Sequence, residues 1–160
     1  MSNIQKSKTS GILWSHNEKK HPKWLGTCIR ACQSQGFIWW DVGWRIDFEH
    51  FSFPITGYIW STAEKQATHE AAIESGSEIV SQPNKELANK VRKNLEALGV
   101  WINPHSPLLE YLRDERETLT LLKLAELERL PSPLGLEAFK SWDGRPIVRP
   151  PQSYYRIMLP

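Results

Sequence analysis

The sequence predicts an α+β protein with a small antiparallel sheet of two to three strands, a packed alanine-rich helix, two to three further helices and an extended proline-rich C-terminal tail. Apolar residues alternate without a break from Ile38 to Phe48, alanines recur every four residues from Ala63, and leucines follow helical spacing after Pro83. Period two is typical of a half-buried strand, and spacings of three and four are typical of a helix. With 160 residues, of which 40% are hydrophobic and 24% charged, the chain is expected to form one domain with a substantial core.

The first predicted strand begins at Ile38. Its inward positions are Ile38, Trp40, Val42, Trp44, Ile46 and Phe48, and its outward positions are Trp39, Asp41, Gly43, Arg45, Asp47 and Glu49. We expect Trp40, Trp44 and Ile46 to be buried together. The chain then turns, and residues 55–60 predict a second strand in which Gly57 marks a bulge or a close approach of two chain segments.

A helix is predicted directly after this second strand. Ser61 is followed three residues later by Glu64, which is the spacing of a capping box. Alanines at positions 63, 67 and 71 would share one helical face and let the helix lie close against the sheet.

Further helices are predicted in the C-terminal half. One begins at Pro83 and ends at Gly99, another begins at Ser106-Pro107, and a short one follows Pro131. Residues 118–124 fit a strand or a helix, and helix is favoured because 115–130 is rich in good helix formers. Prolines between 145 and 151 predict an extended path.

These elements predict one organisation of the chain. We expect a flexible leader over 1–10, a strand–strand–helix module over 11–83, a helical part of the same domain over 84–142, and an extended tail over 143–160. The leader lacks the apolar segment of a secretory signal, no apolar run is long enough to span a membrane, and two cysteines are too few for a disulfide-stabilised secreted scaffold. These observations predict a cytoplasmic protein with no membrane partner.

Charge is distributed unevenly along the chain. Residues 1–32 hold six Lys or Arg against one acid, a net charge of +5, and residues 33–83 hold two against seven, a net charge of −5. The basic segment either lies across an acidic face of its own domain or contacts phosphates. The candidate phosphate-binding residues are Lys19, Lys20, Lys23, Arg30, Arg45, Lys90, Arg92 and Lys93.

Residues 36–75 carry a resemblance to a known family. An aromatic-rich strand, a strand ending in Ile59-Trp60, and then Ser61-Thr62-Ala63-Glu64 before alanines resemble the arm-type DNA-binding domain of integrases and its AP2-like relatives. The segment also resembles, less closely, the strand-to-helix end of double-stranded-RNA-binding domains. Either resemblance implies three strands, a packed helix and nucleic-acid binding. In the arm-type and AP2-like families the exposed sheet face is cationic, whereas here it would carry three acids and only Arg45.

The sequence contains no common catalytic motif and one candidate set of metal ligands. The sequence has no G-x-S-x-G, no H-E-x-x-H and no glycine-rich phosphate loop, so no catalytic residue, cofactor or small-molecule substrate is predicted. Two imidazoles and two thiols occur close together and form the ligand set of a structural zinc site, namely His16, His21, Cys28 and Cys32. Their spacing is loose, and cysteine is also a common small buried residue.

The sequence therefore predicts a non-enzymatic protein. We expect an accessory or adaptor protein that acts by protein–protein interaction within a larger assembly, because eight Trp and a Pro-, Arg- and Tyr-containing tail offer partner surfaces. The candidate partner-binding residues are Phe37, Trp39, Arg145, Arg149, Tyr154 and Tyr155. The alternative is nucleic-acid binding by the basic N-terminal third, in a mobile-element or defence nucleoprotein. A second alternative is a small zinc-binding module.

Overall fold

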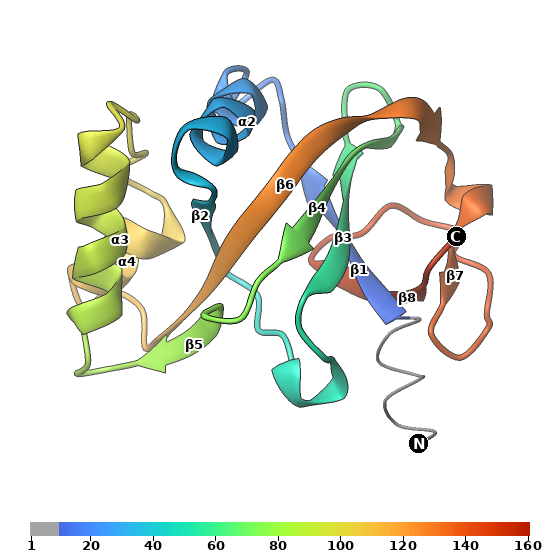
Figure 1. Cartoon of the computed structure of the whole chain (residues 1–160). Helices are drawn as coiled ribbons and strands as arrows, with labels where there is room; N and C mark the ends of the chain where they lie inside the picture. The colour runs from blue at the N-terminus through green and yellow to red at the C-terminus, as the bar shows by residue number, and fades with distance from the viewer. Residues whose placement is uncertain (1–9) are drawn as a thin grey trace.

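The computed structural model describes residues 10–160 and is built on one eight-stranded mixed sheet (Figure 1). The strand order is β2-β6-β4-β3-β1-β8-β7, and β5 pairs with β6 off this path. β1 and β3 run parallel, and every other pair is antiparallel. This sheet corrects the predicted fold class, because a small sheet of two to three strands with several helices does not describe the molecule.

The elements have the following bounds. The strands are β1 Ser10–His16, β2 Ile38–Val42, β3 Ile55–Ser61, β4 Gln66–Ile73, β5 Glu78–Ser81, β6 Thr118–Leu134, β7 Lys140–Ser141 and β8 Tyr154–Met158. The α-helices in the described part are α2 Trp24–Gln35, α3 Glu86–Ala97 and α4 Pro107–Leu112, with short 3₁₀ turns at Phe48–His50 and Leu136–Ala138. The sheet crosses the expected boundaries at 83 and 142, because β6 and β8 pair with strands from the N-terminal part.

β1 lies inside the sheet and is buried on both faces. Ile12 and Trp14 belong to the larger core cluster, whereas Leu13 belongs to a second cluster with Phe139 and Ile157. A strand covered on both faces needs no polar alternation. The sequence of this segment therefore shows no alternation that would predict a strand. The expected leader lies outside the described residues, except for Ser10, which begins β1.

Gly57 of β3 confirms the expected close approach. A Cβ at this position would lie 2.5 Å from Cζ3 of Trp14. The absence of a side chain lets the indole of β1 pack directly on the backbone of β3.

β4 replaces the predicted alanine-rich helix. The Ser61 hydroxyl does accept the backbone N–H of Glu64 at 2.9 Å, but the bond closes the turn between β3 and β4. Alanines four residues apart share one face of a strand as well as of a helix, so their spacing cannot distinguish the two. Residues 36–75 consequently contain β2, β3 and β4 and lack the α-helix that the arm-type resemblance implies.

β6 is a 17-residue strand where helix was favoured (Figure 1). It pairs with β2, β4 and β5, and Leu119, Leu121, Leu122 and Leu124 are fully or almost fully buried. These residues are good intrinsic helix formers, but helix propensities differ by only about 0–0.7 kcal/mol per residue. Strand pairing and burial outweigh such differences, and the segment is a strand. The short helix expected after Pro131 is likewise the end of β6 and a 3₁₀ turn.

The predicted first strand is shorter than its alternation. β2 ends at Val42, and the following residues are irregular until the 3₁₀ turn. Trp40 and Ile46 are buried as expected, but Trp44 is only half-buried and packs on Tyr154 with ring centroids 4.8 Å apart. Trp39, expected to face outward, is 5% exposed.

Three other expectations are confirmed. α3 follows the leucine stripe and is succeeded by Gly99 with φ of 73°. α4 begins at Pro107, and the Ser106 hydroxyl accepts the Leu109 N–H as its cap. β3 occupies the predicted second strand. Within residues 10–160, no helix combines the length and the apolar character that a membrane span requires.

Candidate functional site

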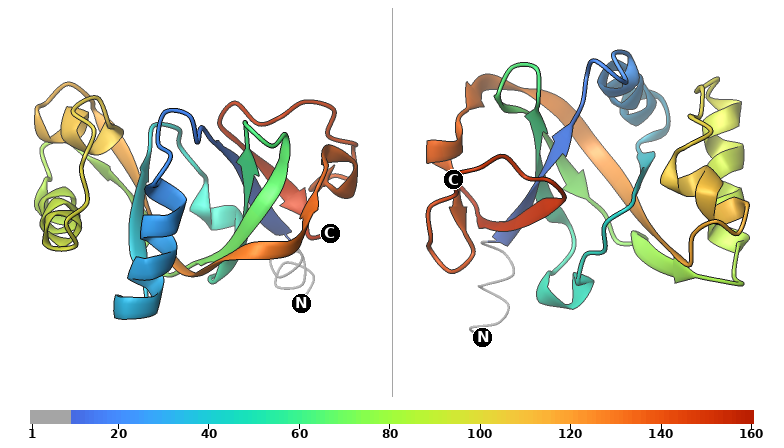
Figure 2. Two further views of the ribbon diagram at one scale, coloured as in Figure 1. Left: turned by 90° about the horizontal axis from the view of Figure 1, so that it is seen from above. Right: turned by 180° about the vertical axis from the view of Figure 1, so that it is seen from behind.

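A cleft of about 810 Å³ lies between α2 and the segment that joins α3 to α4. Figure 2 shows α2 standing apart from the α3–α4 pair at the β2 end of the sheet. The end of β1, the loop 17–23 and β2 complete the walls. β2 is the terminal strand of the sheet and pairs only with β6 among the described strands. The cleft therefore runs along a free sheet edge, where alternate backbone N–H and C=O groups have no neighbouring strand.

One wall of the cleft is basic. Lys20, Lys23 and Arg30 all line it and are exposed. Asn17 fixes the loop before α2, because its Oδ1 accepts the backbone N–H groups of Lys19 and Lys20 at 3.1 and 3.3 Å.

The cleft-facing side of α2 follows from helical periodicity. Lys23, Thr27, Arg30 and Ser34 recur at three- and four-residue spacing and line the cleft, while Leu25 and Cys28 on the other side are buried in the core. The Thr27 hydroxyl accepts a hydrogen bond from the Arg30 guanidinium at 3.3 Å. In the described part of the chain, none of Lys19, Lys20, Lys23 and Arg30 forms an ion pair.

Aromatic rings form the inner wall. Trp40 is at the centre, with ring centroids 5.5 Å from Trp24 and 5.6 Å from His16, both edge-to-face. His21 stacks on His16 at 6.3 Å. Trp40 and His16 are buried and Trp24 is half-buried, so the rings form an apolar inner wall beside the basic one.

His16 is held neutral in this wall. Its pKa is lowered to about 4, mainly by burial and in smaller part by the charge of His21, while a backbone hydrogen bond with His21 opposes the shift. Its Nε2 is buried and has no hydrogen-bond partner.

Asp41 supplies the one carboxylate among the cleft-lining residues of the described chain. It is half-buried, and its Oδ2 accepts the Leu108 N–H at 2.8 Å. Burial raises the pKa of Asp41, whereas the Leu108 hydrogen bond and the charges of Arg116 and His21 oppose that rise. The contact ties β2 to the first turn of α4.

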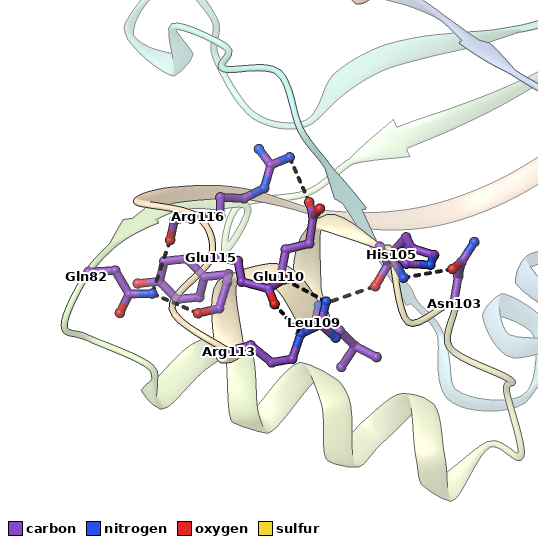
Figure 3. A network of polar contacts seen from close by, with 10 residues as sticks. Gln82, Asn103, His105, Leu109, Glu110, Arg113, Glu115 and Arg116 are labelled. Atoms are coloured by element: carbon purple, nitrogen blue, oxygen red, sulfur yellow. Dashed lines mark hydrogen bonds and ion pairs between the residues drawn. The ribbon is translucent and has the colours of Figure 1, made fainter.

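The remaining wall is the α3–α4 connection, which carries Trp101 with 74% of its surface exposed. The segment is anchored by the polar network around α4 (Figure 3). The Arg116 guanidinium bonds Glu110 at 3.1 Å, and Gln82 Nε2 donates to the backbone carbonyls of Tyr111 and Arg116 at 2.7 and 3.2 Å. Asn103 Oδ1 accepts the His105 N–H at 2.8 Å. The base of this wall is therefore fixed while the indole of Trp101 faces solvent.

A reciprocal contact joins the two helices beside the cleft. Gln35 of α2 and Asn94 of α3 exchange side-chain hydrogen bonds, both at 3.1 Å. This contact joins the two helices whose ends form the walls.

Comparison with known proteins identifies the fold and not a family. No protein-family model matches the sequence, and no curated protein matches it. The structure of ASCH from Zymomonas mobilis is similar over 90% of this chain and 85% of that chain, with a TM-score of 0.52 and 13% identity. The structure of a point mutant of the same protein is similar over 90% of this chain and 87% of that chain, with a TM-score of 0.51 and 14% identity. The chain has an ASCH-like fold.

A third structure is more distant. The N-terminal domain of Staphylothermus marinus McrB covers 88% of both chains at 14% identity, with a TM-score of 0.37 that supports no argument. At these identities the comparisons concern the fold, and the site rests on this chain's own residues.

The predicted basic residues divide into two groups. Lys20, Lys23 and Arg30 are brought together in the cleft. The others lie outside it: Lys19 is exposed on the adjoining turn, Arg45, Lys90 and Lys93 are exposed elsewhere, and Arg92 pairs with Glu96 at 3.8 Å.

The idea that this cluster neutralises an acidic sheet face is not supported by the contacts. Asp41 bonds the Leu108 N–H, and Asp47 lies 3.4 Å from His50. Asp47 and Glu49 follow β2 in irregular structure and a 3₁₀ turn, so Asp41, Asp47 and Glu49 do not form the acidic strand face that was predicted.

The predicted partner-binding residues are not gathered in one surface. Trp39 is buried, and Phe37 is half-buried with the Lys123 ammonium 4.8 Å from its ring centroid. Tyr154 and Tyr155 are half-buried in β8, and Arg145 and Arg149 are exposed in the preceding segment.

The four predicted zinc ligands are also separated. His16 and His21 line the cleft, whereas Cys28 is buried in the core and Cys32 donates to the Leu124 carbonyl at 3.7 Å. Burial raises the pKa of the Cys28 thiol and disfavours the thiolate that a metal requires. Among residues 10–160, no three His, Cys, Asp or Glu are grouped as a metal site. The structure therefore does not bring the four predicted ligands together.

Sequence reasoning missed the wall formed by Trp101 and His105. Their signal was available, because Trp101 stands between Gly99 and Asn103-Pro104, which mark a loop. A large aromatic residue in a predicted loop is a candidate for binding.

Proposed function

We propose that this chain binds single-stranded nucleic acid in the cleft between α2 and the α3–α4 connection. The observation that carries the proposal is the convergence of Lys20, Lys23 and Arg30, without ion-pair partners among the described residues, on a cleft that also presents Trp101. Cations supply most of the affinity for a phosphate backbone, and aromatic faces stack on unpaired bases.

The basic wall favours a polyanion over a neutral ligand. An exposed lysine without an acidic partner can neutralise a phosphate, and the cations that this releases from the nucleic acid drive binding. The chain's net charge is only +2, so the attraction is local to the cleft and not a property of the whole surface.

The shape of the cleft favours a single strand over a duplex. Its volume of about 810 Å³ lies within the range of roughly 300–1,000 Å³ that encloses a small ligand, which is too small for a double helix. Trp101, which is 74% exposed on one wall, offers a ring face on which an unpaired base could stack.

This function is favoured over the adaptor role because the predicted phosphate-binding residues and the predicted partner-binding residues are placed differently in the fold. Three of the predicted phosphate-binding residues meet in one cleft, whereas the predicted partner-binding residues are buried or dispersed.

Fluorescence anisotropy with labelled ten-nucleotide RNA, ten-nucleotide DNA and a DNA duplex tests the proposal at low salt. We expect both single strands to bind more tightly than the duplex, and the triple variant Lys20→Ala/Lys23→Ala/Arg30→Ala to weaken their binding by roughly tenfold or more. The matched control is Lys90→Ala/Lys93→Ala, which removes exposed cations of α3 outside the cleft and should retain wild-type affinity. Equal losses in both variants, or no retention of either single strand, would reject the proposed site.

A further inference from the structure

Asp41 is an acidic side chain in a cleft that we propose binds phosphates. It is the one carboxylate among the described lining residues, and it stands in the same cleft as Lys20, Lys23 and Arg30. A phosphate beside it would be repelled. The hydrogen bond from Leu108 uses Oδ2 of Asp41 and explains how Asp41 positions α4. This bond does not use Oδ1, and the Asp41 side chain lines the cleft.

The surroundings of Asp41 suit a flat, uncharged ligand. Trp40, the preceding residue of β2, lies against the rings of Trp24 and His16 at 5.5 and 5.6 Å, and all three line the cleft. The inner wall thus combines aromatic surface with a hydrogen-bond acceptor, which is how proteins hold an unstacked base.

His16 provides a second, independent observation in the same part of the cleft. It is 5% exposed and lines the cleft, yet its buried Nε2 has no hydrogen-bond partner. Buried polar atoms are rarely left unpaired, because desolvation then goes uncompensated. Nε2 of a neutral imidazole can donate or accept, depending on the tautomer.

Resting on the proposed function, we infer that the inner end of the cleft takes one unstacked nucleobase and selects a base with an exocyclic amino group, which donates to the Asp41 carboxylate. His16 Nε2 is a second polar contact for the same base. The basic wall holds the phosphates on either side. A carboxylate accepts from the amino group of cytosine, whereas uracil presents a carbonyl oxygen at that position and would be repelled.

Two homopolymers of equal size isolate this contact. Ten-nucleotide oligo(dC) and oligo(dU) have the same backbone and similar rings, and their bases differ at C4, which bears an amino group or a carbonyl oxygen, and at the adjacent N3, which accepts or donates a hydrogen bond. Wild-type protein is expected to bind oligo(dC) roughly tenfold more tightly, as one discriminating base contact provides. In Asp41→Asn, the amide oxygen can still accept the Leu108 N–H, but the preference should fall to about twofold or less with oligo(dU) binding retained.

The outcomes separate this inference from the proposed function. Equal affinity of the wild type for the two oligomers, or an equal loss for both in Asp41→Asn, would overturn base selection by Asp41 and leave the cleft as a phosphate-binding site. Failure of the wild type to bind either oligomer would overturn the proposed function, and the base site with it. Thermal melting of Asp41→Asn shows whether a general loss comes from unfolding.

Discussion

His16 illustrates how a single buried group links the site to the stability of the fold. Its pKa of about 4, lowered mainly by burial, keeps it neutral where an exposed histidine would titrate near 6.5. The unfolded chain therefore binds a proton that the folded chain excludes. Stability on this account is fully present above about pH 6.5 and falls as the pH drops toward 4.

Acidification should accordingly destabilise the protein, and His16→Gln should reduce the effect. The shift sets an upper limit of about 3 kcal/mol for the contribution of His16 between pH 7 and pH 4. Burial also lowers the pKa of His69, so the free energy of unfolding of His16→Gln should still fall somewhat on acidification. The raised pKa of Asp41 acts in the opposite direction, because its protonation is favoured in the folded state.

Urea denaturation at pH 7 and pH 4.5 measures this difference. The matched control is His50→Gln, since the His50 side chain is 56% exposed. Identical pH dependences for wild type, His16→Gln and His50→Gln would contradict the assignment of a buried neutral His16.

Gly57 makes a second prediction at the level of one residue. Gly57→Ala would place a methyl group 2.5 Å from Trp14 and 3.3 Å from Ile73. We expect a loss of about 1–3 kcal/mol in the free energy of unfolding, as for other overpacked sites. Gly26→Ala is the control, because this glycine is in α2 and its new methyl would meet only the end of Arg30. It should stabilise the helix by up to about 1 kcal/mol, and a Gly57→Ala variant that melts like wild type would refute the close packing of β1 on β3.

At the scale of elements, the sequence predicted the secondary structure correctly where a residue pattern fits only one type of element. The leucine stripe of α3 fits only a helix, and its Gly99 end signal agreed with it. The alanines of β4 and the leucines of β6 fit both periods, and the choice depended on strands distant in sequence. β1 was missed because a strand buried on both faces shows no alternation.

The candidate site was predictable to the same degree. Lys20, Lys23 and Arg30 are close in sequence, so their clustering was visible in the uneven charge. Trp101 and Asp41 join them only through the long-range contact between β2 and α4, which no local pattern encodes.

The α3–α4 connection makes a prediction about binding that does not involve stability. Trp101 is 74% exposed, so Trp101→Ala should leave the melting temperature nearly unchanged. Loss of a stacking surface should weaken single-strand binding by about 1–3 kcal/mol.

Trp142→Ala is the control for this experiment. Trp142 is also exposed, at 55%, but lies outside the cleft and packs on Arg156 at 4.7 Å. Anisotropy titrations should show a loss for Trp101→Ala and wild-type affinity for Trp142→Ala. Equal affinities for both variants would exclude stacking on Trp101.

At the scale of the whole molecule, the sheet brings two segments distant in sequence together, residues 16–41 and residues 95–107. β1 delivers His16 and the basic loop to the cleft, β2 forms its free edge, and α4 docks on β2 through Asp41. The ASCH-like arrangement thus places a local positive cluster on a protein with a net charge of only +2. Binding to a polyanion should then depend on a few contacts and not on overall charge.

The salt dependence of single-strand binding tests this central claim most directly. Each phosphate contact contributes about 0.7 to the slope of log K against log salt concentration for a single strand. Three contacts from Lys20, Lys23 and Arg30 predict a slope of roughly −2 for the wild type, and a slope near zero for the triple alanine variant. A triple variant that keeps the wild-type slope would show that phosphates are bound elsewhere and would contradict the account.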